Sequence, residues 1–132
     1  MLQISEKSMQ AFKDACAKLG HTDALPNVDG LPADKGLYTQ AVYMLATIVE
    51  AQKEGNVRDI TNHSERKYEP YFYAEEGYEP GSGSGGFSFS VTNSGGTYSC
   101  VGARLSSNSH VDARDIALEY PDLYEIFILN IK

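Results

Sequence analysis

Basic residues and long apolar runs are both scarce in this chain of 132 residues. Its 11 lysine and arginine residues stand against 18 aspartate and glutamate residues, so the formal net charge is −7. A chain with this deficit of positive charge is poorly suited to bind the phosphate backbone of nucleic acids or an anionic membrane surface. No run approaches the ~20 apolar residues that a membrane-spanning helix needs. We therefore expect neither a nucleic acid nor a membrane as a partner.

Cysteine is also rare, and the chain contains only Cys16 and Cys100, without a C-x-x-C motif. Both fall inside predicted elements, where a free cysteine usually packs as a small hydrophobic residue. The first seven residues lack the basic start and the apolar run of a signal peptide. These features favour two reduced thiols in a cytoplasmic protein. A disulfide between the two stays an alternative, because a sequence does not fix the distance between their Cα atoms.

The histidines do not form a pattern that is typical of metal or catalytic sites, and tryptophan is absent. His21, His63 and His110 are the only histidines, no two of them are four residues apart, and there is no H-E-x-x-H motif. A zinc site would have to gather its ligands from separate elements. The chain has no tryptophan to form a sugar-binding platform beside a pair of carboxylates. We expect no metal ion and no cofactor.

Glycine, in contrast, is plentiful in the second half, and Gly81, Gly83 and Gly86 match the pattern G-x-G-x-x-G. In a dinucleotide-binding fold this pattern lies between a strand and a helix, because the pyrophosphate is bound at the helix N-terminus. Here an alternating apolar run over residues 87–91 follows the glycines and predicts a strand instead. We interpret the glycine-rich segment as a flexible connection within a hairpin.

The first part of the chain predicts two helices. Apolar residues recur at three- and four-residue steps between Ser5, a good N-cap, and Gly20, a good C-terminal stop. A second and more apolar periodic run spans about residues 36–54, with Asp34 as its expected cap. Because this second helix is apolar around much of its circumference, we expect it to be central.

The middle of the chain predicts strands. Aromatic and β-branched residues alternate with other residues in three runs, over residues 68–73, 87–91 and 97–105. Pro70 cannot donate a hydrogen bond to a ladder, which places the first run at a sheet edge or beside a bulge. In the second run, strict alternation places Val91 on the same face as the two phenylalanines that precede it.

A final helical pattern runs from Ser109 to the C-terminus. Pro121 interrupts it and should kink the helix or begin a new one, because proline lacks the amide hydrogen. We therefore predict one α+β domain over residues 1–132, with the element order α-α-β-β-β-α. A small antiparallel sheet of about three strands is covered by two N-terminal helices and a C-terminal helix.

Three strings occur at fixed distances in the second half of the chain: Val101-Gly102-Ala103-Arg104-Leu105, then Ser109 and Ala113, and then Asp122-Leu123-Tyr124. In these strings the chain resembles a family of small proteins from prophages and mobile elements of gut Bacteroidetes. The resemblance extends over roughly residues 25–129. It implies an origin in a phage or a mobile element. It implies no activity, because the family has no established one.

The tyrosines of the first strand are the best candidates for binding. Tyr71 and Tyr73 alternate with Phe72, so the two tyrosines face outwards if Phe72 is buried. Tyrosine is common at binding surfaces because it offers a large contact area at a small loss of entropy. We predict a working face that consists of Tyr71, Tyr73, Tyr78 and the loop 81–86, including Gly83. Arg104, within the third predicted strand, pairs with a carboxylate, covers apolar surface with its stem, or contacts a ligand.

These observations favour a non-enzymatic protein that binds an unidentified protein partner, as an accessory protein of a phage or mobile element. One alternative is a small enzyme that depends on Cys100 or on His63. A second alternative is an acidic inhibitor that imitates DNA. We rank the DNA mimic last, because the carboxylates are scattered over helices and loops rather than spaced along one face.

Overall fold

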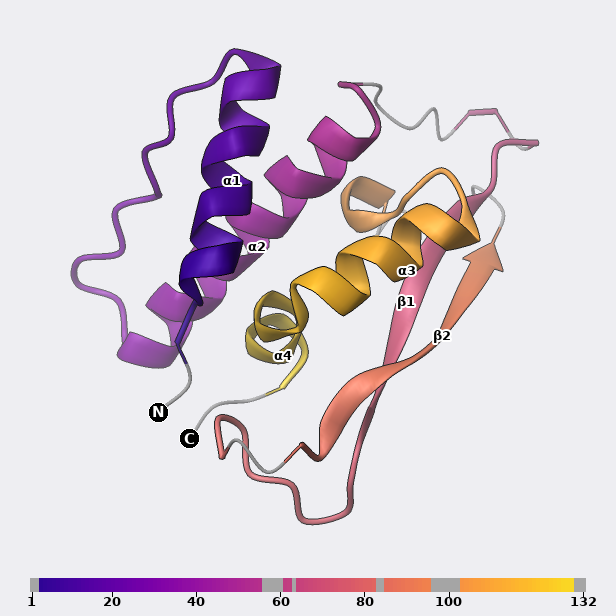
Figure 1. Cartoon of the computed structure of the whole chain (residues 1–132). Coiled ribbons are helices and arrows are strands. Elements are labelled where there is room, and N and C mark those ends of the chain that lie inside the picture. The colour runs from indigo at the N-terminus through magenta and orange to yellow at the C-terminus, as the bar shows by residue number, and fades with distance from the viewer. Residues whose placement is uncertain (1–2, 56–60, 63, 83–84, 96–102, 130–132) are drawn as a thin grey trace.

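A computed structural model of the chain (Figure 1) describes residues 3–55, 61–62, 64–82, 85–95 and 103–129. It has an α+β architecture, as predicted, with two N-terminal helices, a two-stranded antiparallel sheet and C-terminal helices. The elements in chain order are α1 (Glu6–Leu19), α2 (Ala33–Gln52), β1 (Lys67–Ala74), β2 (Phe87–Gly95), the short 3-10 helix η1 (Ala103–Leu105), α3 (His110–Glu119) and α4 (Pro121–Ile128).

The first helix begins and ends where the sequence predicts. The Ser5 side chain accepts a hydrogen bond from the Ser8 amide at 3.1 Å, which satisfies one of the free amides of the first turn of α1. Gly20 ends the helix in the left-handed conformation, with φ 72°, a region that glycine enters without strain. The second helix starts earlier than predicted, directly after Pro32, so Asp34 lies in its first turn and is not its cap.

The C-terminal helical pattern forms two helices rather than one. The Ser109 side chain caps α3 by accepting a hydrogen bond from the Asp112 amide at 3.1 Å. Pro121 is the first residue of α4, where a missing amide hydrogen leaves no helical bond unmade. The sequence alternative that this proline begins a new helix is therefore confirmed.

The strands β1 and β2 pair in antiparallel register, with Phe72 opposite Phe89 and Tyr71 opposite Val91. The register shifts between these two pairs, so Ser90 is an extra residue and forms a β-bulge. The bulge moves Val91 to the face opposite Phe89. The prediction that Val91 shares a face with the phenylalanines is therefore wrong, because strict alternation fails at the bulge.

The third predicted strand, over residues 97–105, is corrected at its end. Residues 96–102 lie outside the described part of the chain, but residues 103–105 form η1 rather than a strand. The chain turns here so that Leu105 packs against the helical core. Ser107 then pairs with β1 as an isolated bridge, with backbone hydrogen bonds of 3.2 and 2.9 Å to Tyr68. Within the described residues the sheet has two strands rather than about three.

The hydrophobic core lies among the helices. Four large side chains from α1, α2 and α4 have no exposed surface, and these are Phe12, Met44, Leu45 and Leu123. In Figure 1, α1 and α2 lie side by side, and α3 lies across one face of the hairpin. The connection from β1 to β2 lies at the bottom of that view, beyond α4. The helices thus cover one face of the hairpin.

Among the described residues, none of the helices has both the length and the apolar character that crossing a bilayer requires.

Candidate functional site

One face of the hairpin attaches it to the helices, and Phe72 is the central residue of this attachment. Its ring centroid lies 4.9 Å from that of Tyr124 on α4 and 5.0 Å from that of Phe87 on β2. Phe89 adds an edge-on contact with a centroid distance of 6.3 Å. These aromatic contacts fix the orientation of the hairpin relative to the helices.

The opposite face of the hairpin points away from the helices. We call it the outer face, and it consists of Glu69, Tyr71, Tyr73, Ser88, Val91 and Asn93. Tyr71 is 51% exposed, Tyr73 58% and Val91 55%. The Asn93 side chain donates a hydrogen bond of 3.0 Å to the Tyr71 hydroxyl, which holds that ring in place. The expected alternation of a half-buried Phe72 with two exposed tyrosines is therefore present.

Tyr78 does not belong to this outer face, although the sequence grouped it there. Its hydroxyl donates a 2.5 Å hydrogen bond to Glu125 Oε1 on α4, and its ring stacks on Phe87. The hydrogen bond to Glu125 is the main cause that raises the pKa of Tyr78. The Gly81 amide donates to the same carboxylate oxygen at 3.0 Å. Through these hydrogen bonds Tyr78 and Gly81 hold the connection between β1 and β2 against α4, on the side of the helices.

The glycine-rich connection has a packing role where it is described. Gly86 is buried, and a Cβ atom at this position would lie 2.7 Å from Cδ1 of Tyr78, so the close approach of Tyr78 requires glycine. Gly83 lies outside the described residues. The predicted contribution of this loop to binding therefore stays a prediction.

Arg104 is exposed in η1 and does not lie within a strand. Its guanidinium forms no ion pair with any other residue in the described ranges. Of the hypotheses for Arg104, the structural ion pair has no support among these residues. Packing of its stem on apolar surface stays a prediction. Contact with a ligand stays a prediction.

The residues of the alternative enzyme hypothesis are not brought together by the described structure. Cys16 is buried in α1 as a free thiol, and burial raises its pKa, which disfavours the reactive thiolate. Cys100 and His63 lie outside the described residues. The ring centroids of His110 and Tyr68 lie 4.6 Å apart in an edge-on arrangement. The Nδ1 atom of His110 is also hydrogen-bonded to the Thr92 hydroxyl, so His110 joins α3 to the hairpin.

The described part of the chain contains no cluster of three or more histidine, cysteine, aspartate or glutamate residues that could hold a metal ion. Two shallow hollows lie on the helical side. One, of about 450 Å³, is lined mainly by apolar residues that include Ile4, Val28 and Leu37. The other, of about 350 Å³, lies between α1, α2 and α3. Neither contains a cysteine or histidine that could act as a nucleophile or base.

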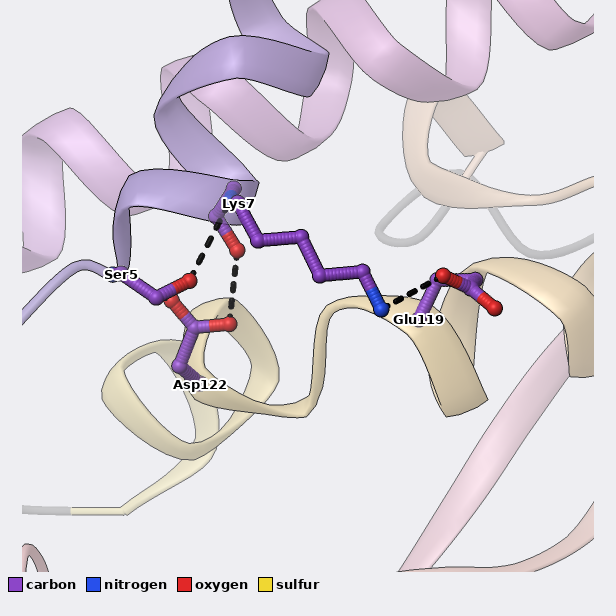
Figure 2. Close-up of polar contacts among 5 residues, drawn as sticks. Ser5, Lys7, Glu119 and Asp122 are labelled. Carbon is purple, nitrogen blue, oxygen red and sulfur yellow. Dashed lines mark hydrogen bonds and ion pairs between the residues drawn. The ribbon is translucent and has the colours of Figure 1, made fainter.

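Asp122 has a role that the sequence did not predict. Its Oδ2 accepts a 2.9 Å hydrogen bond from the Ser5 amide, and its Oδ1 accepts a 2.7 Å hydrogen bond from the buried Ser8 hydroxyl. Figure 2 shows this contact between the start of α1 and the start of α4, beside the ion pair of Lys7 with Glu119 at 2.6 Å. The carboxylate joins segments more than 110 residues apart, so no local pattern indicates it.

The string Asp122-Leu123-Tyr124, which carries part of the family resemblance, is therefore structural. Asp122 fastens α1, Leu123 is fully buried, and Tyr124 is 4% exposed beneath Phe72. Burial raises the pKa of the Tyr124 hydroxyl well above its usual range. Asp122 thus joins α4 to α1, and Tyr124 joins α4 to the hairpin.

Comparisons of the chain with protein-family models, with curated proteins and with solved structures gave no match. The outer face is therefore the candidate functional site. Val91 is the residue of that face that the sequence analysis missed. Pro70, which indicated a bulge as one of two possibilities, was the only signal that could have placed it.

Proposed function

We propose that this chain is a non-enzymatic protein-binding or accessory protein, and that the outer face of its hairpin binds the partner protein. The observation that carries the proposal is the cluster of Tyr71, Tyr73 and Val91, each more than half exposed on the face that none of the described helices covers. The resemblance to proteins of prophages and mobile elements supports an origin in such an element.

The cluster of Tyr71, Tyr73 and Val91 combines exposed area with a rigid support. Two half-exposed tyrosines and a valine present on the order of 300 Å² of side-chain surface, the size of patch that is often functional on a monomer. The strand beneath them is fixed because Phe72 packs against Tyr124. A partner would therefore meet rigid side chains and lose little conformational entropy on binding.

Charge favours a protein partner over a nucleic acid or a membrane. The outer face presents one carboxylate, Glu69, to solvent. Lys67, the first residue of β1, lies on the same side of the strand but is buried, and the whole chain has a formal charge of −7. Phosphate groups would be repelled rather than bound by such a surface. Exposed tyrosines without basic neighbours are typical of protein-binding surfaces and not of single-strand platforms.

Capture of the partner from a host lysate tests the proposal. We expect the wild-type chain to retain a specific protein, and the double variant Tyr71→Ala/Tyr73→Ala to lose it. The matched control is Val111→Ala/Leu118→Ala, because these residues are 52% and 57% exposed on α3 and lie outside the outer face. The control should retain the partner. Loss of capture in the control, or its persistence in the tyrosine variant, contradicts the proposal.

Thiol alkylation tests the enzyme alternative separately. In the variant Cys16→Ala the only remaining thiol is Cys100. A catalytic cysteine is a thiolate near neutral pH and is alkylated rapidly, whereas an ordinary thiol with a pKa of about 8.5 reacts slowly at pH 7. We expect slow alkylation. Rapid alkylation at pH 7 would favour the enzyme and count against our proposal.

A further inference from the structure

The two edges of β1 meet different partners. On one edge the Glu75 amide donates a 2.8 Å hydrogen bond to the Gly86 carbonyl, which continues the pairing with β2. On the other edge the Tyr68 amide donates to the Ser107 carbonyl at 3.2 Å, and the Ser107 amide donates to the Tyr68 carbonyl at 2.9 Å. The main-chain groups of successive residues in a strand point to alternate edges, so those of the even-numbered residues of β1 point away from β2.

This second edge is open beyond the bridge to Ser107. We call its open part the β1 edge, and it consists of the main-chain groups of Pro70, Phe72 and Ala74. Ser107 is the only described residue whose main chain bonds to this side of β1. Leu105 would lie opposite Pro70 if the pairing of Ser107 continued, but it belongs to η1 instead. In Figure 1 the lower half of β1 has no other described element beside it on the side away from β2.

We propose that the β1 edge binds an extended segment of the partner protein as a third, antiparallel strand. This inference rests on the proposed function and adds the mode of binding. The amides of Phe72 and Ala74 donate to carbonyls of the segment, and the carbonyls of residues 70, 72 and 74 accept from its amides. Addition of a strand to an open edge is a recurring way in which proteins bind peptides. The added strand continues the antiparallel pairing that Ser107 begins.

The opposite edge of the sheet, on β2, is less suited to this role. The β-bulge at Ser90 interrupts the regular spacing of its main-chain groups, and a bulge is one of the features that blunt an exposed edge. The helix α3 also approaches this strand, because the Nδ1 atom of His110 is hydrogen-bonded to the Thr92 hydroxyl. The extra residue of the bulge lies on β2, so β1 keeps a regular spacing over residues 70–74.

The added strand would extend the outer face. Residues that lie opposite each other in neighbouring strands share a face, so the residue of the segment opposite Phe72 points towards the helices. Its two neighbours then lie beside Tyr71 and Tyr73 on the outer face. Aromatic and β-branched side chains pair favourably with tyrosine across strands. The segment therefore carries such residues beside the two tyrosines and has no proline where its amides face β1.

A second copy of this chain fits the β1 edge less well. In a two-fold antiparallel pairing centred on Phe72, Ala74 of each copy lies opposite Pro70 of the other. The Ala74 carbonyl then faces a residue that has no amide hydrogen, so each copy loses one hydrogen bond. A partner segment without proline supplies a donor at this position.

Amide hydrogen exchange of the free chain tests whether the β1 edge is open. The Ala74 amide has no acceptor among the described residues, whereas the Tyr73 amide points towards β2. We expect the Ala74 amide to exchange at least about tenfold faster than that of Tyr73. Slow exchange at Ala74 in the free chain would mean that another part of the chain covers the edge, and it would overturn the inference.

Fluorescence anisotropy with a defined peptide tests the binding mode. The probe is a labelled nine-residue peptide of alternating threonine and valine between two terminal lysines. The reference peptide carries a methyl group on each internal amide nitrogen, which removes the donors and keeps the side chains and the charge. We expect the probe to bind and the reference not to bind. Failure of the probe to bind, or equal binding of the two peptides, contradicts strand addition.

A proline variant locates the probe on the β1 edge. Ala74→Pro removes an amide hydrogen that does not bond to β2, so the hairpin tolerates the change. It should weaken binding about tenfold, because an acceptor of the peptide loses its donor. The matched control Ala74→Val keeps the amide at this exposed position and should stay within about twofold. Circular dichroism shows whether both variants are folded, and equal binding by the two overturns the inference.

The inference and the proposed function can fail independently. If the lysate partner is captured through Tyr71 and Tyr73 while Ala74→Pro captures it as well as Ala74→Val does, strand addition is wrong and the proposed function stands. If capture depends on neither the tyrosines nor the Ala74 amide, both are wrong. A dimer of the free chain that Ala74→Pro dissociates, measured by sedimentation, would assign the edge to a second copy and also overturn the inference.

Discussion

The helices and the hairpin use their apolar residues in opposite ways. In the helical part the large side chains are enclosed, and Phe12, Met44 and Leu123 have no exposed surface. In the hairpin one face is half-buried and the other displays Tyr71 and Val91 to solvent. Exposed aromatic surface contributes little to folding, because only area removed from water is stabilising. The buried area that stabilises the fold therefore lies mainly among the helices, and the exposed side chains of the outer face contribute little to it.

The polar contacts follow the same division. Asp122 accepts hydrogen bonds from Ser5 and from the buried Ser8 hydroxyl, so it joins α1 to α4 within a partly buried site. The hydrogen bond between Asn93 and Tyr71 is exposed on the outer face. A partly buried network is more sensitive to the loss of one partner, because the remaining donor is left without an acceptor away from water.

The largest difference is expected from two leucine truncations. Leu123→Ala removes a fully buried side chain of α4 and should lower the free energy of unfolding by about 2–5 kcal/mol. Leu118→Ala is the matched control, since Leu118 is 57% exposed on α3, and its effect should stay within about 0.5 kcal/mol. Urea unfolding measures both. Similar losses in the two variants would contradict the assignment of stability to the helical core.

The next effect concerns the polar link between α1 and α4. Asp122→Ala leaves the buried Ser8 hydroxyl without its acceptor and should lower the free energy of unfolding by about 1–3 kcal/mol. Ser8→Ala in the same background should add little, because the two residues share one interaction. The exposed ion pair of Lys7 provides the contrast, and Lys7→Ala should give no measurable change near physiological salt. Additive losses for Ser8 and Asp122 would exclude the link.

Alkaline pH should weaken the protein through Tyr124. Burial raises the pKa of Tyr124 above that of an unfolded tyrosine, which is about 10. Above pH 10 the unfolded chain loses this proton while the folded chain keeps it, so stability falls as pH rises and is fully present below pH 10. The slope reaches about 1.4 kcal/mol per pH unit for one such group.

The variant Tyr124→Phe isolates this contribution. Urea unfolding between pH 9 and pH 11 should give a shallower loss of stability for the variant than for the wild type. Other groups that titrate in this range are unchanged by the substitution and therefore cancel in the comparison. Parallel curves for the two proteins would show that Tyr124 does not titrate in the way its burial implies.

Only a small effect on stability is expected at the outer face. Tyr71→Ala/Tyr73→Ala removes two rings that are more than half exposed, so the free energy of unfolding should change by no more than about 1 kcal/mol. Phe72→Ala, one residue between them, should have a larger effect because its ring contacts Tyr124 and Phe87. Thermal melting compares the two. If the tyrosine variant unfolds, these residues support the fold and are not reserved for binding.

Local signals predicted several helix ends that a single residue determines, although Asp34 was wrongly expected to cap α2. Ser5 and Gly20 fix the ends of α1, and Pro121 begins α4 because a missing amide hydrogen is tolerated only in the first turn. The exposure of Tyr71 and Tyr73 followed from the two-residue period of a strand.

Features that depend on distant contacts could not be predicted in this way. The side of the sheet that Val91 occupies depends on the bulge at Ser90, and alternation alone carries no sign of it. Tyr78 was grouped with the outer face because it is near in sequence, but Glu125, 47 residues away, determines where it lies. Leu105 leaves the strand pattern to pack on the helical core.

Site-specific photocrosslinking tests the central claim most directly, since it compares the outer face with the helical surface in the folded protein. A photoreactive residue is placed at position 91 in one variant and at position 118 in another, where the native side chains are 55% and 57% exposed. Each variant is irradiated in a host lysate. We predict a crosslinked partner from position 91 and none from position 118. A partner crosslinked from position 118 and not from position 91 would contradict the account.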